Sequence, residues 1–172
     1  MFDQIRNFVA ELTGAPEPRS FSPDDFRLAA AALLVHLAGA DGTFADVEQR
    51  RLHEIIETRF GLDNATTTRL IELAEVQDRQ AVDFYHFTHA LTNALDQDGR
   101  QKIITMMWEI AFADGTVTEV EESIVARIAD LLGVSRQDRL RLRQQVADEV
   151  AAGTAFAGPW APATTAARGS LS

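Results

Sequence analysis

A nine-residue segment occurs twice in this sequence, as ADGTFADVE at positions 40–48 and as ADGTVTEVE at positions 113–121. The second copy lies 73 positions after the first, and residues 33–60 align with 106–133 without a gap, with eight identities. The apolar residues around each copy recur at helical spacing. Because this period exceeds that of solenoid units, it predicts a duplicated bundle whose two halves pack about a pseudo-two-fold axis.

The apolar pattern predicts an all-α protein, since no segment alternates with a period of two over a useful length. We expect a compact bundle of about seven to eight helices. The predicted helices span about 2–13, 22–39, 43–59, 63–76, 78–95, 100–111, 116–132 and 135–152. The predicted domain organisation is an N-terminal helix and linker at 1–21, a helical domain at 22–152 and a flexible tail at 153–172.

Residues with short polar side chains stand where most of these helices begin. The predicted N-caps are Ser22, Thr43, Asp63, Asp78, Thr116 and Ser135. Glu119 follows Thr116 by three positions, which predicts a capping box. On the two helices that follow the repeated segment, Val47 and Val120 are expected to face the core.

The repeated Asp-Gly-Thr is typical of a tight joint between two helices. Gly42 can take the left-handed conformation that ends one helix, and Thr43 can start the next. Asp41 fits less well, because an acid beside a helix C-terminus faces the negative end of the helix dipole. Glu48 and Glu121 lie beyond the predicted caps, so a purely structural joint leaves their recurrence unexplained.

The same pattern also matches the second half of an EF-hand calcium loop, in which Asp, a backbone carbonyl and a terminal Glu hold the ion. The first half is missing. Its ligand positions hold Leu37 and Gly39 in one copy and Ile110 and Phe112 in the other. A complete EF-hand, and with it a calcium sensor that opens on binding, is therefore disfavoured.

A weaker oxygen site at each joint remains as the alternative to a purely structural joint. Its ligands would be an acid, a threonine carbonyl and a glutamate, completed by water or by acids of the other copy. Such oxygen ligands favour calcium or magnesium over zinc as the divalent cation. The candidate metal ligands are Asp41, Thr43 and Glu48 in the first copy and Asp114, Thr116 and Glu121 in the second.

The composition narrows the range of partners. The chain has 26 Asp and Glu residues against 16 Lys and Arg, a net charge of −10, which argues against nucleic acid and suits cations or basic partners as well as simple solubility. It has no cysteine, which excludes disulfides and thiolate sites. Because no signal peptide and no membrane-spanning apolar run is recognisable, we expect a cytoplasmic protein without direct membrane insertion.

Three other groups of residues are candidates for a binding site or a charged surface. Asp83, His86 and His89 stand near one helical face and could hold a metal or form a packing surface with neighbouring aromatic residues. His36 aligns with Glu109, one turn before each joint, so either could join a site or lie on a helix surface. The basic residues Arg136, Arg139, Arg141 and Arg143 are interleaved with polar ones, which predicts a solvated face pairing with the acidic body.

The doubled Ala-Asp-Gly segment after an Ala-rich helix, followed by an apolar helix ending in Leu-Gly-Val-Ser, resembles the TerB-like tellurite-resistance family over about 25–150. The same fold recurs in the N-terminal part of the DjlA co-chaperone. The resemblance implies a compact domain of about seven helices with acidic residues near the joints suspected of binding metal. Carried over to this chain, these residues are Asp41, Glu48, Asp114 and Glu121.

The resemblance further implies a role in stress or tellurite resistance through membrane-linked partners, with no established chemical activity. We therefore predict a non-enzymatic scaffold or interaction module of the bacterial stress response that binds unidentified protein partners and a divalent cation weakly. The alternative is a small metal-dependent enzyme that uses the acids near the joints together with His36 or His86. The oligomeric state is left open.

Overall fold

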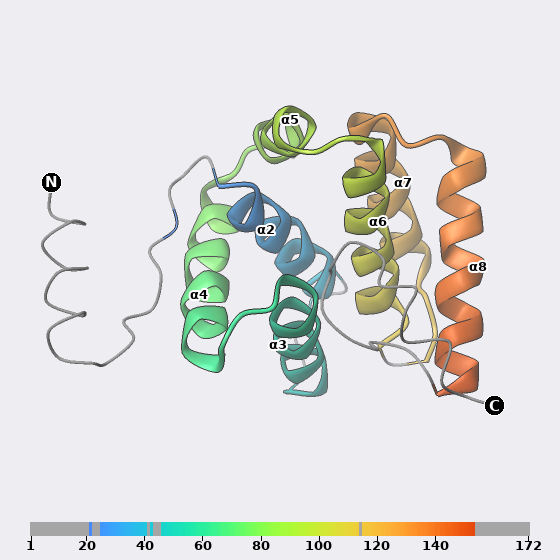
Figure 1. Cartoon of the computed structure of the whole chain (residues 1–172), viewed down its shortest axis with the longest axis horizontal. Coiled ribbons are helices and arrows are strands. Elements are labelled where there is room, and N and C mark those ends of the chain that lie inside the picture. The colour runs from blue at the N-terminus through green and yellow to red at the C-terminus, as the bar shows by residue number, and fades with distance from the viewer. Residues whose placement is uncertain (1–20, 22–24, 41, 43–45, 114, 154–172) are drawn as a thin grey trace, which may run out of the picture.

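The computed structural model describes residues 21, 25–40, 42, 46–113 and 115–153. This part of the chain forms a bundle of seven helices and contains no strand, which confirms the all-α prediction (Figure 1). The predicted helix at 2–13 and the tail beyond Gly153 lie outside the described residues. The helices are α2 (Phe26–Ala38), α3 (Asp46–Phe60), α4 (Asn64–Gln80), α5 (Tyr85–Ala94), α6 (Gln97–Ala111), α7 (Glu119–Leu132) and α8 (Arg136–Ala152).

The helix boundaries repeat along the chain as the sequence predicts. α2 and α6 end at aligned alanines, α3 and α7 begin at aligned acids, and the positive-φ glycines Gly61 and Gly133 end the second helix of each unit. Within each unit all three helices pack against one another, as α2, α3 and α4 and as α6, α7 and α8. The two units lie side by side in Figure 1, joined by contacts between α2 and α6.

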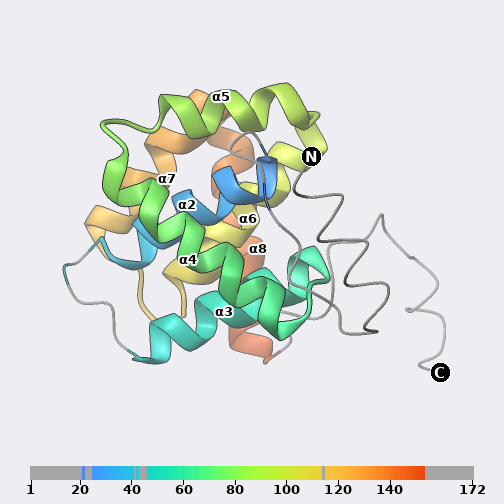
Figure 2. The ribbon, with the colours of Figure 1, turned by 90° about the vertical axis from the view of Figure 1, so that its left-hand side faces the viewer.

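α5 lies outside this repeat and connects the two units. It runs along the top of the molecule in both ribbon views and packs on α2 of the first unit and α7 of the second (Figures 1 and 2). In Figure 2, α4 lies between α5 above and α3 below. α5 therefore forms one end of the bundle, and the residues that lead into it border both units.

α2 is the central helix. Ten of its thirteen residues are buried, including the run of four alanines at 29–32. A helix that is apolar on all sides has to be surrounded by others, and small side chains allow them to approach closely. Its counterpart α6 contributes the larger side chains of the core, among them Met106, Met107 and Trp108.

Several predicted helix starts are confirmed. The Asp63 side chain accepts a hydrogen bond from the Thr66 N–H at 2.7 Å, and the Ser135 Oγ accepts from the Asp138 N–H at 3.1 Å. These N-caps begin the third helix of each unit, α4 and α8. Each satisfies a backbone donor that the first turn of a helix leaves without an intrahelical partner.

Other predicted starts are wrong. α2 is capped by Asp25, whose side chain accepts from the Arg27 N–H at 2.9 Å, whereas Ser22 lies outside the described residues. Asp78 does not begin a helix, because α4 continues through it to Gln80 and the next helix begins at Tyr85. The helix predicted from about 100 begins three residues earlier, at Gln97, with Asp96 as its N-cap.

Two apolar residues expected in the core are exposed instead. Val47 is 53 % exposed and Val120 is 51 % exposed. They occupy aligned positions in the first turn of α3 and of α7. Each begins its helix beside a joint, before the stretch that packs on the neighbouring helices. The structure thus places an apolar side chain on the surface next to each joint.

None of the helices in the described ranges has the combination of length and apolar character needed to cross a membrane.

Candidate functional site

The two joints have the same backbone geometry in the residues that can be described. Gly42 has φ 84° and Gly115 has φ 94°, so both take the left-handed conformation predicted for them. The Gly42 N–H donates to the Gly39 carbonyl at 3.1 Å, and the Gly115 N–H donates to the Phe112 carbonyl at 3.0 Å. Each joint therefore closes its helix by the same hydrogen bond.

The predicted cation ligands are only partly placed. Asp41, Thr43 and Asp114 lie outside the described residues. Glu48 is half-buried in the first turn of α3, and Thr116 is exposed before α7. The oxygen site at each joint consequently stays a prediction.

Glu121 caps a helix, although the sequence pattern placed it beyond the predicted capping box. The Thr118 N–H donates to Glu121 Oε2 at 2.8 Å, and the Glu121 N–H donates to Thr118 Oγ1 at 3.2 Å. These two bonds form the capping box of α7, so the box predicted at Thr116 and Glu119 is wrong. Both registers fit the pattern Thr-x-x-Glu, and pattern alone could not separate them.

The first copy lacks this explanation for its glutamate. The residue aligned with Thr118 is Ala45, which has no side-chain oxygen and cannot complete a reciprocal capping box with Glu48. The capping box therefore accounts for the recurring glutamate in the second copy alone.

The residue one turn before the first joint, His36, forms a hydrogen bond with Asp78 and lines a cleft. His36 Nδ1 lies 2.9 Å from Asp78 Oδ1 of α4, and the imidazole meets the Phe84 ring edge-on with centroids 4.7 Å apart. The pair borders a cleft of about 240 Å³, whose lining also includes Asp83 and Arg127. The sequence pattern pointed to His36 as a candidate and to Asp78 only as an N-cap, because the two residues are 42 positions apart.

The aligned residue before the second joint, Glu109, is fully buried. Arg59 of α3 donates to its Oε1 from Nε at 3.0 Å and from Nη2 at 2.7 Å. Its Oε2 is buried without a hydrogen-bond partner in the described structure. Burial raises the pKa of Glu109 to about 7, and the charge and hydrogen bonds of Arg59 act in the opposite direction. Glu109 is thus an ionisable group of the core, not of the helix surface that we expected.

The residues Asp83, His86 and His89 do not converge. Asp83 Oδ1 accepts from the Tyr85 N–H at 2.9 Å, and the His89 ring stacks on that of Tyr85 with centroids 5.6 Å apart. No three His, Asp or Glu side chains in the described residues are placed to hold a metal ion. Together with Tyr85, which is 63 % exposed, these side chains form a solvent-facing aromatic and histidine surface.

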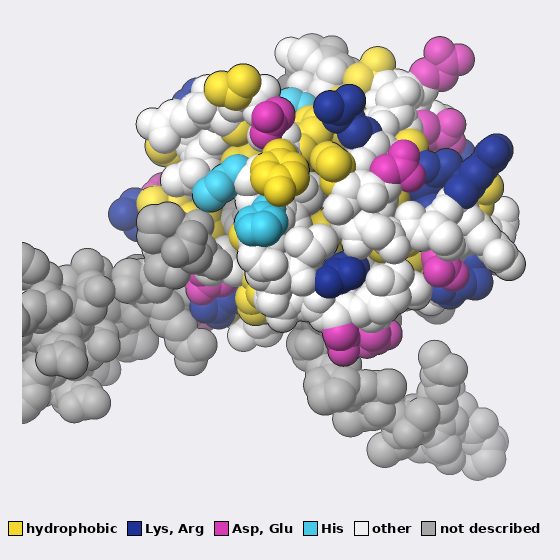
Figure 3. All heavy atoms as spheres, turned by 90° about the horizontal axis from the view of Figure 1, so that it is seen from above, with side chains coloured by type: hydrophobic (Ala, Val, Ile, Leu, Met, Phe, Trp, Pro, Cys, Tyr) yellow, Lys and Arg dark blue, Asp and Glu magenta, His cyan; other side chains and the backbone are white. Residues whose placement is uncertain are grey.

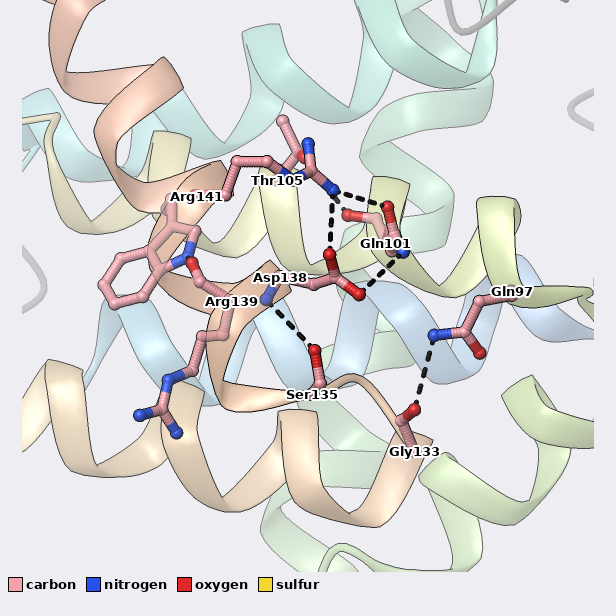
Figure 4. Close-up of polar contacts among 9 residues, drawn as sticks. Gln97, Gln101, Thr105, Gly133, Ser135, Asp138, Arg139 and Arg141 are labelled. Carbon is pink, nitrogen blue, oxygen red and sulfur yellow. Dashed lines mark hydrogen bonds and ion pairs between the residues drawn. The ribbon is translucent and has the colours of Figure 1, made fainter.

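Two of the basic residues near the end of the chain pair with acids, as predicted for this group. Arg141 Nη2 donates to Asp138 Oδ1 at 3.3 Å and to Gln101 Oε1 at 3.0 Å, which ties α8 to α6 (Figure 4). Arg143 lies 2.6 Å from Glu122 of α7. These arginines hold the third helix of the second unit in place.

Comparison with models of protein families places most of the chain in a family. The model of the family described as "Tellurite resistance protein TerB" matches residues 27–144, which run from α2 into α8. A search of curated proteins found no match, and a search of solved structures found none either.

Proposed function

The chain belongs to the TerB tellurite-resistance family, and we propose that it is a non-enzymatic module that binds protein partners in tellurite or stress resistance and a divalent cation weakly at its two joints. The observation that carries the cation proposal is the shared geometry of the joints. Both glycines adopt left-handed φ angles and are preceded by an aspartate in the sequence. Calcium and magnesium bind such combinations of carboxylate and backbone oxygens.

The two joints follow helices that pack against each other, α2 and α6. Both helices end on the same side of the bundle in the two ribbon views (Figures 1 and 2). This arrangement supports a coordination shell in which an acid of one copy, or a water molecule, completes the cation ligands supplied by the other copy. A purely structural joint needs no such proximity.

The exposed valines support the proposal of a protein partner. Val47 and Val120 are each more than half exposed, and each precedes the glutamate of its copy. Apolar side chains at a protein surface gain free energy when a partner covers them. In each copy an exposed valine stands next to a glutamate in the sequence, which suits a partner with an apolar patch and basic rim.

The metal-dependent enzyme is the alternative function, and the His36–Asp78 pair is the observation in its favour. A histidine held by a carboxylate can act as a general base. The residues that line the cleft beside this pair include no serine, threonine, cysteine or lysine that it could activate. We therefore prefer the non-enzymatic module.

Replacement of both joint aspartates by asparagine tests the cation proposal. For the wild-type chain we expect calcium or magnesium at about 100 times its dissociation constant to raise the free energy of unfolding by about 2.7 kcal/mol relative to EDTA. Asp41→Asn with Asp114→Asn should abolish this increase, because it removes one charged ligand from each joint. Thermal unfolding of the full chain at matched ionic strength measures it.

The matched control is Asp98→Asn, which removes a carboxylate that is 75 % exposed and pairs with Lys102 on α6. It should leave the response to the cation unchanged. Absence of a response to calcium, magnesium and zinc in the wild-type chain would contradict the cation proposal and leave the structural joint.

Replacement of the two exposed valines by glutamate tests the partner proposal. We expect Val47→Glu with Val120→Glu, introduced into the gene of the source organism, to lower tellurite tolerance as far as deletion of the gene does. The free energy of unfolding should change by less than about 0.5 kcal/mol for each site, because both side chains are at the surface. Growth on graded tellurite and chemical denaturation measure the two effects.

Leu140→Glu provides the matched control, since Leu140 is 44 % exposed but lies on α8 away from the joints. Full tolerance in the double valine variant, or an equal loss in the Leu140 variant, would contradict a partner surface at the joints.

A further inference from the structure

The cleft beside His36 is separate from the two joints. It lies where α2, α7 and the connection between α4 and α5 meet, and it has a volume of about 240 Å³. Figure 3 views the molecule from the α5 side, where hydrophobic and histidine side chains lie close to basic and acidic ones. A volume below about 300 Å³ is smaller than that of most pockets for drug-sized ligands, so the cleft suits a small ligand or a single group.

The carboxylates of the cleft already have hydrogen-bond donors. Asp78 Oδ1 is paired with His36 Nδ1 at 2.9 Å, and Asp83 Oδ1 accepts from the Tyr85 N–H at 2.9 Å. Among the described residues the Arg127 guanidinium and His36 Nε2 have no partner, and the second carboxylate oxygens of Asp78 and Asp83 have none either. The guanidinium carries five N–H donors, and an imidazolium that donates to Asp78 from Nδ1 has a second donor at Nε2. The cleft therefore holds a guanidinium that no acid among the described residues neutralises.

A larger cleft near the start of α2 differs in that its arginines are paired with acids. It has a volume of about 610 Å³ and is lined by Arg27 and Arg59 among others. Arg27 is paired with Asp25 at 2.9 Å, and Arg59 with Glu109 at 2.7 Å. Both guanidinium groups of that cleft are already neutralised, whereas Arg127 is not paired with any described acid.

We propose that the cleft formed by His36, Asp78, Phe84 and Arg127 binds a small oxyanion, through a carboxylate or a phosphate group. Arg127 supplies the charge and a planar pair of donors that match such a group. His36 is oriented by Asp78, and its imidazolium form has a second donor at Nε2, while the ring of Phe84 forms an apolar wall. A cation is disfavoured, since the described residues contain no set of three ligands placed for a metal.

The test is a titration of the full chain with sodium phosphate and, separately, with sodium acetate, at constant ionic strength and pH 6.5. The resonances of the His36 ring and of the Arg127 side chain are followed by NMR. We expect saturable shifts with at least one of the two anions. Arg127→Gln should weaken binding by about tenfold, the loss expected for a hydrogen bond to a charged group. The anion that saturates the shifts distinguishes the two ligand sources.

Two further variants make the result specific. Asp83→Asn removes a negative charge from the cleft while it keeps an oxygen for the Tyr85 N–H, so it should tighten anion binding. Arg79→Gln removes an equal charge from an exposed position at the end of α4 and should leave binding unchanged. Circular dichroism confirms that the variants fold.

Three results would overturn the proposal. One is the absence of a saturable shift with either anion in the wild-type chain. Another is equal weakening by Arg127→Gln and Arg79→Gln, which indicates a general effect of charge. The third is the reversed pattern, in which Asp83→Asn weakens and Arg127→Gln tightens binding, because that pattern indicates a cation site.

Discussion

Replacement of Arg59 by methionine is expected to lower the free energy of unfolding by about 3–5 kcal/mol at pH 8. Arg59 makes both hydrogen bonds that Glu109 Oε1 accepts from it, at 3.0 and 2.7 Å, and Glu109 is 0 % exposed. Without the guanidinium, an ionised carboxylate would remain in the core with neither its counter-charge nor these hydrogen bonds. Urea denaturation followed by circular dichroism measures the loss.

The size of this effect should depend on pH. The pKa of Glu109 is raised from 4.5 to about 7 in the folded chain, so the folded state binds a proton more tightly than the unfolded state does. The contribution of Glu109 to stability is therefore most favourable below about pH 4.5, declines as the pH rises to about 7, and is fully unfavourable above that. At pH 5 most of Glu109 is neutral when folded, and Arg59→Met should cost only about 1 kcal/mol.

The negative charge of Glu149 on α8 also raises the pKa of Glu109, so it contributes to the same pH range. Two controls separate the ion pair from other effects. In the background Glu109→Gln, Arg59→Met should lose its pH dependence. Arg69→Met removes an exposed arginine that lies 3.6 Å from Glu72, and it should change stability by less than about 1 kcal/mol. A cost for Arg59→Met that is equal at pH 5 and pH 8 would contradict this account.

The fold could be predicted because its signals are local and occur twice. Glycine stops such as Gly133 and N-caps such as Asp63 depend on a few neighbouring residues, and the structure confirms them. The predicted helix starts were wrong where the same local sequence pattern fitted two different starting residues. Thr116 and Thr118 both begin the sequence pattern Thr-x-x-Glu, but only Thr118 forms the capping box, and Asp78 resembles an N-cap although α4 continues past it. Tertiary packing decides which of these alternative helix starts forms, and the sequence of a single segment carries no information about that packing.

The burial of the first turn of α3 and α7 could not be read from periodicity. Val47 and Val120 have helical spacing to the core residues that follow them, yet both are about half exposed. Periodicity reports which face of a helix is apolar, but not where along its length the neighbouring helices end. The ion pair of Arg59 with Glu109 could not be predicted from periodicity either, because the two residues are 50 positions apart in the sequence.

The two units are not interchangeable, and Trp108 is where they differ most. It aligns with Val35 of the first unit. Trp108 is 1 % exposed, its Nε1–H donates to the Arg139 carbonyl at 3.1 Å, and the Arg143 guanidinium lies 5.6 Å from its ring centroid. The buried residues of α8 are Leu142 and Val146, so the contacts with the tryptophan add to a small apolar contact area.

Replacement of Trp108 by valine, the residue of the aligned position, is therefore expected to lower the free energy of unfolding by about 3 kcal/mol or more. The change leaves a cavity, removes the donor to the Arg139 carbonyl and removes the ring beneath Arg143. Chemical denaturation followed by circular dichroism measures the loss. Tyr85→Val, the same type of truncation at a residue that is 63 % exposed, should cost less than about 0.5 kcal/mol. A loss below about 1 kcal/mol for Trp108→Val would mean that α8 is held without the tryptophan.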